Sequence, residues 1–179
     1  VFTAAFCENG GAGRWIPEAP HEYVHVVQDS QGMFFDFQPC WSTEGMANYY
    51  GVAIGKPNQV FLNGLIKQDL NSTINSFDPN QTFGALLLSN SVETTVSLMT
   101  KMEVPNPEDR LPACYQLGGW AYEALVATYG QDKIVEYLKT FQDQNGWKTN
   151  FEFVFGIKPE VFYQRLTPYF AAKAKEILS

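Results

Sequence analysis

The only two histidines of this chain stand four residues apart, in the segment His21-Glu22-Tyr23-Val24-His25. On an α-helix, positions i and i+4 lie on the same face, about one turn apart. Two imidazoles placed in this way can bind one metal ion at about 2.0–2.1 Å. Pro17 and Pro20 stand where a helix can begin, so we predict a helix from there to Asp29 that carries a zinc site of the H-E-x-x-H type.

Glu22 follows the first histidine directly, so its carboxylate lies on the neighbouring edge of the predicted helix. Zinc lowers the pKa of a bound water to about 7, and a carboxylate beside that water can accept its proton at neutral pH. We therefore predict His21 and His25 as metal ligands and Glu22 as general base. The competing interpretation is a pair of histidines on an ordinary helix of a structural domain.

A catalytic zinc needs a third protein ligand and an open position for water. Because the chain has no further histidine, this ligand must be a carboxylate or a thiolate. Glu44 is the candidate, since it begins a second predicted helix that starts at Ser42 or Thr43. The 18 residues between His25 and Glu44 allow that helix to return antiparallel. Two alternatives remain: Cys40 as ligand, and Glu44 as a carboxylate that only favours the helix dipole.

This combination resembles the gluzincin metallopeptidases, which have H-E-x-x-H, then this spacing, then a Glu followed by Gly and small residues. The resemblance covers His21–Tyr50 well and is looser at Cys114–Gly130. Aminopeptidase-type gluzincins share the spacing, and thermolysin-like enzymes also place the Glu on a following helix. Metzincins are excluded, because Gln28 and Asp29 stand where a Gly and a third His are expected.

The resemblance implies zinc as cofactor, a peptide or protein as substrate, and hydrolysis of the peptide bond. An inactive zinc-bearing binding or scaffold domain of the same fold is the alternative. In the aminopeptidase-type branch, a Tyr that opens a downstream helix in a Tyr-x-x-Gly context stabilises the oxyanion. Tyr115-Gln116-Leu117-Gly118 resembles that stretch, which implies Tyr115 as a catalytic residue. An aromatic core residue is the competing interpretation for Tyr115, and Tyr49 and Tyr50 are weaker candidates.

Ligating histidines usually donate their other ring N–H to a nearby acceptor. Asn48 lies four residues after Glu44 and is predicted to accept such a bond or to face solvent; thermolysin-like enzymes have an acidic residue there. Aminopeptidase-type enzymes also carry an exopeptidase motif well upstream of the zinc helix. Only 20 residues precede His21, and Glu8-Asn9 lies too close to the helix to be that element. Aminopeptidase activity is therefore not predicted.

The rest of the pattern predicts a mainly α (α+β) fold, which the resemblance narrows to a zincin-like catalytic domain with a short N-terminal β edge. We expect residues 1–179 to form one such domain of a longer chain, with 1–56 as the zinc-site segment and 57–179 as a helical subdomain. Strands are predicted at Phe2–Phe6 and Phe151–Phe155, and a long loop at the prolines of 105–112. Further helices are expected to about Ile54 and near 58–70, 80–102, 112–129, 131–144 and 158–178.

Composition excludes several other classes of protein. With 45% apolar and 15% aromatic residues, the chain can bury a sizeable core. It has no cluster of Lys and Arg, so nucleic acid is not an expected partner, and its net charge of −7 favours cationic ones. No apolar run is long enough for a membrane span. The family resemblance favours an extracellular or periplasmic location.

The three cysteines, Cys7, Cys40 and Cys114, fit neither a full disulfide framework nor a cysteine-rich zinc site. We predict Cys7–Cys40 as the pair if one disulfide forms, and three separate thiols otherwise.

Overall fold

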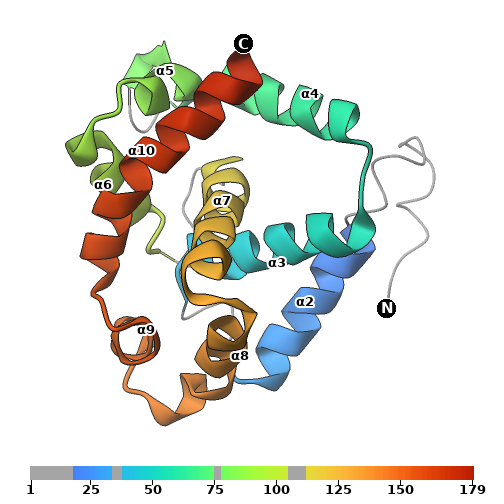
Figure 1. Ribbon diagram of the computed structural model, residues 1–179, viewed down its shortest axis with the longest axis vertical. Coiled ribbons are helices and arrows are strands. Elements are labelled where there is room, and N and C mark those ends of the chain that lie inside the picture. The colour runs from blue at the N-terminus through green and yellow to red at the C-terminus, as the bar shows by residue number, and fades with distance from the viewer. Residues whose placement is uncertain (1–17, 34–37, 75–77, 105–111) are drawn as a thin grey trace.

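The computed structural model describes residues 18–33, 38–74, 78–104 and 112–179. Over these ranges the protein is mainly helical, as the sequence predicts (Figure 1). The predicted strand at Phe2–Phe6 and most of the proline-marked loop lie outside the described residues. The helices are α2 Glu18–Ser30, α3 Cys40–Gly55, α4 Gln59–Leu70, α5 Phe83–Leu88, α6 Val92–Lys101, α7 Pro112–Tyr129, α8 Gln131–Lys139, α9 Trp147–Phe155 and α10 Pro159–Leu178.

Two short antiparallel strands, β1 (Thr73–Ile74) and β2 (Asp78–Thr82), form a hairpin between α4 and α5. A 3₁₀ turn at Phe141–Asp143 follows α8, where the sequence predicts that the helix continues to residue 144. None of the helices in the described part of the chain is both long and apolar enough to cross a membrane.

Helix α3 lies at the centre of the fold, with α2 packed on one side and α7 crossing it on another (Figure 1). The crossing of α3 and α7 is very close, because each helix presents a glycine there. A Cβ atom on Gly45 would overlap the backbone of Gly118, and a Cβ on Gly118 would overlap the Trp41 carbonyl. Only glycine permits this separation of the two helices.

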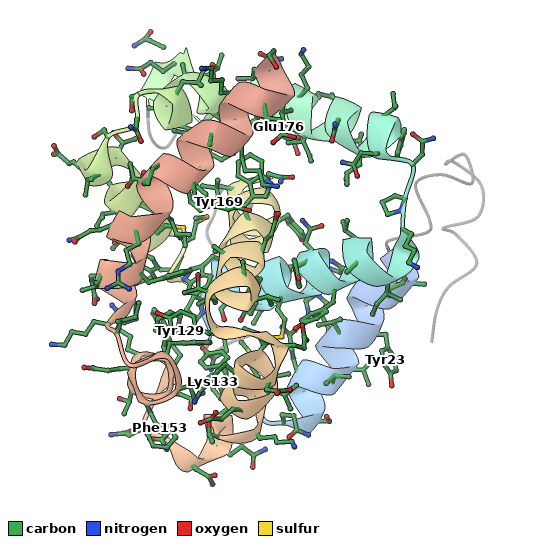
Figure 2. All side chains as sticks on the ribbon, in the orientation of Figure 1. Tyr23, Tyr129, Lys133, Phe153, Tyr169 and Glu176 are labelled. Atoms are coloured by element: carbon green, nitrogen blue, oxygen red, sulfur yellow. A yellow bond between two sulfur atoms is a disulfide. The ribbon has the colours of Figure 1, made fainter. Side chains whose placement is uncertain are left out.

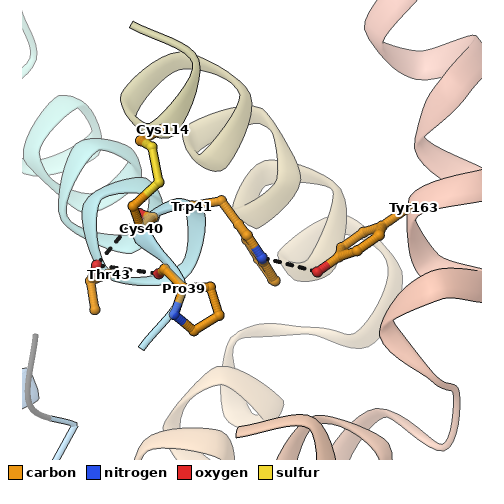
Figure 3. Close-up of a disulfide and its surroundings, with 6 residues drawn as sticks. All are labelled: Pro39, Cys40, Trp41, Thr43, Cys114 and Tyr163. Atoms are coloured by element: carbon orange, nitrogen blue, oxygen red, sulfur yellow. Dashed lines mark hydrogen bonds between the residues drawn. A yellow bond between two sulfur atoms is a disulfide. The ribbon is translucent and has the colours of Figure 1, made fainter. Parts of the chain in front are cut away.

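One buried core runs through both expected segments, 1–56 and 57–179. Trp41 of α3 is fully buried, and its indole N–H donates to the hydroxyl of Tyr163 on α10 at 3.0 Å (Figure 3). Rings from α7, α9 and α10 surround it. Helix α3, which follows α2 in the chain, is therefore held by residues more than a hundred positions away.

A disulfide joins Cys40 to Cys114, with their Cα atoms 5.5 Å apart (Figure 3). The predicted Cys7–Cys40 pair is therefore wrong, and Cys40 is not a thiolate ligand. The two cysteines are 74 residues apart in sequence, and spacing alone does not show that α3 and α7 begin side by side. Closing a loop of this length stabilises the fold by about 4 kcal/mol in the chain-entropy description.

Helix α3 begins at Cys40, not at the predicted Ser42 or Thr43. The hydroxyls of those two residues do not cap it. The first N–H groups are instead bound by backbone carbonyls that follow α6, as with the 3.1 Å bond from Cys40 to Val104. Tertiary contacts thus replace the local cap. As a result Glu44 lies in the second turn of α3, away from the helix N-terminus.

Phe151–Phe155 is the end of helix α9, so the prediction of an extended segment there is wrong. The alternating sequence would place Phe151, Phe153 and Phe155 on one side of a strand. In the helix, Phe151, Val154 and Phe155 are buried, while Phe153 is 60% exposed. These three buried residues are spaced at i, i+3 and i+4, so they share the helix face that packs against α8 and α10.

The helix predicted over 80–102 is divided into β2, α5 and α6. Thr82 caps the start of α5 and Ser91 caps the start of α6, each through its side-chain oxygen. Between them Asn90 adopts a left-handed conformation with φ of 51°, which ends the helical path. The turn residues Ser89-Asn90-Ser91 carry this signal in the sequence.

Candidate metal centre

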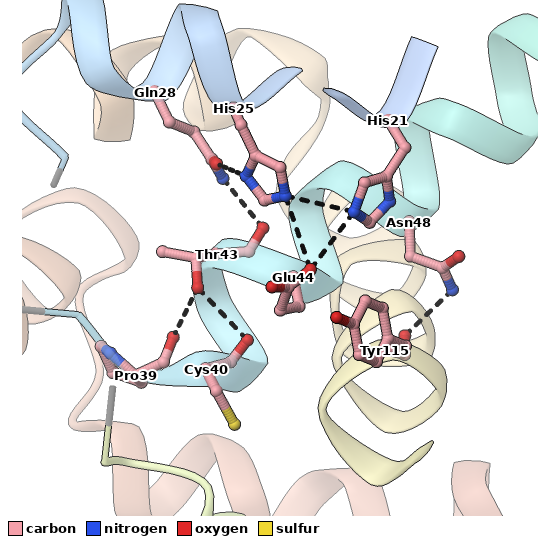
Figure 4. A network of polar contacts seen from close by, with 9 residues as sticks. All are labelled: His21, His25, Gln28, Pro39, Cys40, Thr43, Glu44, Asn48 and Tyr115. Carbon is pink, nitrogen blue, oxygen red and sulfur yellow. Dashed lines mark hydrogen bonds and ion pairs between the residues drawn. The ribbon is translucent and has the colours of Figure 1, made fainter. Parts of the chain in front are cut away.

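The three predicted ligands come together between α2 and α3 (Figure 4). His21 Nε2 lies 3.1 Å from His25 Nε2 and 3.2 Å from Glu44 Oε2, and His25 Nε2 lies 3.5 Å from the same oxygen. In a tetrahedral site with metal–ligand bonds of about 2.0–2.1 Å, two ligand atoms are about 3.3–3.4 Å apart. The two imidazoles and the carboxylate therefore fit zinc both by chemistry and by spacing.

Helix α2 directs both histidines towards α3 because of its periodicity. His21, Val24, His25 and Gln28 follow the i, i+3, i+4, i+7 pattern of one helix face. Val24 is 8% exposed and Gln28 1% exposed, so this face is packed against the fold. Tyr23, on the outer face, is 65% exposed. His21 and His25 therefore share one face of the helix, as the sequence predicts, and this face is directed towards α3.

Glu44 is buried, with 8% of its surface exposed. Burial alone would raise its pKa, but hydrogen bonds from His21 and His25, together with their charges, lower the pKa of Glu44 to about 2. The carboxylate is therefore ionised at neutral pH, as a metal ligand must be. Its burial and its place in the second turn argue against a role confined to the helix dipole.

His25 is oriented by a residue that the sequence analysis does not single out. His25 Nδ1 donates to Gln28 Oε1 at 2.7 Å, and Gln28 Nε2 donates to the Thr43 carbonyl at 3.0 Å (Figure 4). Because the amide oxygen is an acceptor, the ring proton is on Nδ1, and Nε2 offers its lone pair to the metal position. Gln28 follows His25 by three residues and so lies on the same helix face, which is the signal in the sequence that could have identified it.

The charge state of His25 responds to its surroundings. Burial lowers its pKa, but the hydrogen bonds with Glu44 and Gln28 and the charges of Glu44 and Glu22 outweigh burial and raise the pKa above the ordinary value. A metal ion at this position would have to displace the proton, so we expect metal affinity to fall as the pH drops through the raised pKa of His25.

Replacing Gln28 with leucine is expected to weaken zinc binding about 10- to 100-fold, because the bond that orients His25 is lost. Competition with a chromophoric chelator measures the zinc affinity. Gln31→Leu is the matched control, since Gln31 lies in the turn directly after the same helix and its side chain donates to the hydroxyl of exposed Ser30, away from the triad. If both variants bound zinc as tightly as the wild type, Gln28 would have no role in orienting His25 for metal binding.

Asn48 makes a different contact from the predicted one. Its amide nitrogen donates to the backbone carbonyl of Tyr115 at 3.0 Å, so it links α3 to the start of α7 (Figure 4). Gln28 is the residue that accepts the bond from His25. Asn48 thereby helps to hold Tyr115 beside the triad.

Tyr115 lies next to the candidate ligands, as the sequence predicts. Its ring stacks on His21 with centroids 5.9 Å apart and an interplanar angle of 25°, and its hydroxyl is directed towards Glu44 (Figure 4). Tyr115 is 37% exposed, which argues against a core aromatic. Tyr49 and Tyr50 pack on each other, and the hydroxyl of Tyr50 binds Gln131.

The two histidines of the triad are partly exposed to solvent. The side chains of His21 and His25 are 14% and 23% exposed, and Glu22 is exposed on the adjacent edge of α2.

Comparisons of the chain with protein-family models, with curated proteins and with solved structures found no match in any of the three. The function must therefore be inferred from the site itself.

Proposed function

We propose that this protein is a zinc-dependent peptidase of the zincin-like gluzincin type. His21, His25 and Glu44 hold the metal, and Glu22 is the general base. The observation that carries the proposal is the spacing of three donor atoms, all within 3.5 Å of one another, beside an exposed carboxylate. A structural zinc site closes all four positions with protein ligands, whereas three ligands and solvent access are typical of catalysis.

Zinc bound at the triad would supply a Lewis acid that polarises the scissile carbonyl and acidifies water. Glu22 takes the proton of the attacking water and delivers it to the leaving amine. The hydroxyl of Tyr115, whose ring stacks on His21, donates a hydrogen bond to the oxyanion that develops on the carbonyl. Gln28 keeps His25 in the tautomer that binds metal.

The Cys40–Cys114 disulfide supports an extracellular or periplasmic location for this activity, since disulfides persist in oxidising compartments. Cys114 immediately precedes Tyr115, and Cys40 lies one turn before Glu44. The disulfide therefore fixes the helix turns that carry one ligand and the candidate oxyanion donor.

The proposal is tested by metal analysis together with a peptide-cleavage assay. Purified protein is expected to hold about one zinc per chain, because the three candidate ligands form a single site. His25→Ala is expected to lose both the zinc and the cleavage of a peptide library. Zinc without cleavage would point to the binding-domain alternative. Absence of zinc after reconstitution would mean that the H-E-x-x-H segment is accidental.

A further inference from the structure

A cavity of about 470 Å³ is lined by residues of α3, α4, α7 and α10 and lies outside the candidate triad of His21, His25 and Glu44. Its volume falls in the range of about 300–1,000 Å³ that small ligands occupy in proteins. None of the candidate ligands lines it. Asn48 does, and Asn48 is also the residue that binds the Tyr115 carbonyl next to the triad.

The cavity continues the face of the triad along two helices. On α3, Asn48 and Val52 follow Glu44 at four-residue intervals, and both line the cavity. On α7, Gly119 and Glu123 follow Tyr115 in the same way and also line it. Each interval is one turn, about 6 Å along the helix axis. The cavity therefore begins about one turn from the triad, within reach of a substrate side chain near the scissile bond.

The cavity is lined partly by apolar and partly by charged side chains. Leu62, Ile66 and Trp120 provide apolar surface. The charged lining residues are two carboxylates, Glu123 and Glu176, and one ammonium group, Lys173. Figure 2 labels Glu176 where α10 approaches α4.

Lys173 Nζ lies 2.9 Å from a Glu123 oxygen, so its charge is already paired. One negative charge remains in excess. Burial and the negative charge of Glu123 raise the pKa of the Tyr169 hydroxyl on α10.

We propose that this cavity receives the side chain of a lysine or arginine in the peptide substrate. The inference rests on the proposed function, because a peptide bound at the triad brings its side chains to the cavity. The alkyl stem packs on the apolar wall, and the cationic end reaches the carboxylates of Glu123 and Glu176. A basic substrate also fits the net charge of −7 of the chain.

The test uses end-blocked pentapeptides of the form Ala-Ala-Xaa-Ala-Ala with lysine, norleucine or glutamate at the centre. Norleucine has nearly the stem of lysine without the ammonium group, so it isolates the charge. Dissociation constants are measured by NMR titration of the zinc-equilibrated Glu22→Gln protein, in which cleavage does not consume the probe. We expect the lysine peptide to bind at least about tenfold more tightly than the norleucine peptide.

The double variant Glu123→Gln, Glu176→Gln leaves Lys173 unpaired and is expected to reverse the preference towards the glutamate peptide. Glu152→Gln, on the exposed side of α9, controls for the loss of negative charge in general. Equal binding of the lysine and norleucine peptides, or a preference that survives the double substitution, would overturn the inference.

The same measurements separate this inference from the proposed function. If the wild type cleaves no peptide but the lysine preference depends on the two carboxylates, the cavity assignment stands and the peptidase proposal fails. If the wild type cleaves peptides with no preference for basic residues, and the lysine peptide binds no more tightly than the norleucine peptide, the peptidase proposal stands and the cavity assignment fails.

Discussion

Glu22→Gln is expected to reduce peptide turnover by about 100- to 10,000-fold, the usual contribution of a general base. The zinc content should stay near one per chain, because Glu22 is exposed beside the triad and is not one of its donors. Glutamine has the shape of glutamate but cannot accept the proton of the attacking water. Steady-state kinetics with elemental analysis of the same sample measures both quantities, and kcat is expected to fall more than KM rises.

Asp29→Asn is the matched control for this substitution. Asp29 is an exposed carboxylate on the same helix and is not a donor of the metal cluster, so its loss should leave turnover within about twofold of the wild type. The general-base assignment would be rejected if the Glu22 variant kept near-normal turnover with full zinc. A parallel loss of zinc and turnover would mean that Glu22 supports the metal itself.

The ligand face of α2 can be predicted because helix periodicity is a local property. His21 and His25 share a face whatever surrounds the helix, and the neighbouring Val24 needs burial on that same face. Glu44 can be predicted because the chain has no third histidine, so another ligand type is needed. The 18 residues after His25 are enough for the next helix to run back antiparallel to α2. The sequence therefore predicts that these three side chains meet, and their donor atoms do meet.

The parts that could not be predicted depend on contacts between distant segments. The partner of Cys40 is set by where α7 begins, and the start of α3 is set by carbonyls after α6. Local signals instead favoured Ser42 or Thr43 as a cap. Phe151–Phe155 illustrates the same limit, because its alternation is compatible with a strand until the surfaces of α8 and α10 select the helical face.

Gly45→Ala is expected to lower the free energy of unfolding by at least about 2–3 kcal/mol, at the upper end of the cost of overpacking. The added methyl group would overlap the backbone of Gly118, which cannot rotate away as a side chain can. Helices α3 and α7 must then separate, and Glu44 and Tyr115 move with them. Chemical denaturation measures the stability, and chelator competition should show weaker zinc binding.

Gly64→Ala provides the matched control, since Gly64 lies in helix α4 and a Cβ there would meet nothing within 4 Å. This change should be neutral or stabilising by up to about 1 kcal/mol, the helix propensity difference between the two residues. Both substitutions add one methyl group within a helix, so propensity cancels in the comparison. A Gly45 variant as stable as the Gly64 variant, with unchanged zinc affinity, would show that the close crossing does not position the site. The expected difference would show that the glycine contact, together with the disulfide, holds Glu44, the candidate third ligand, in place.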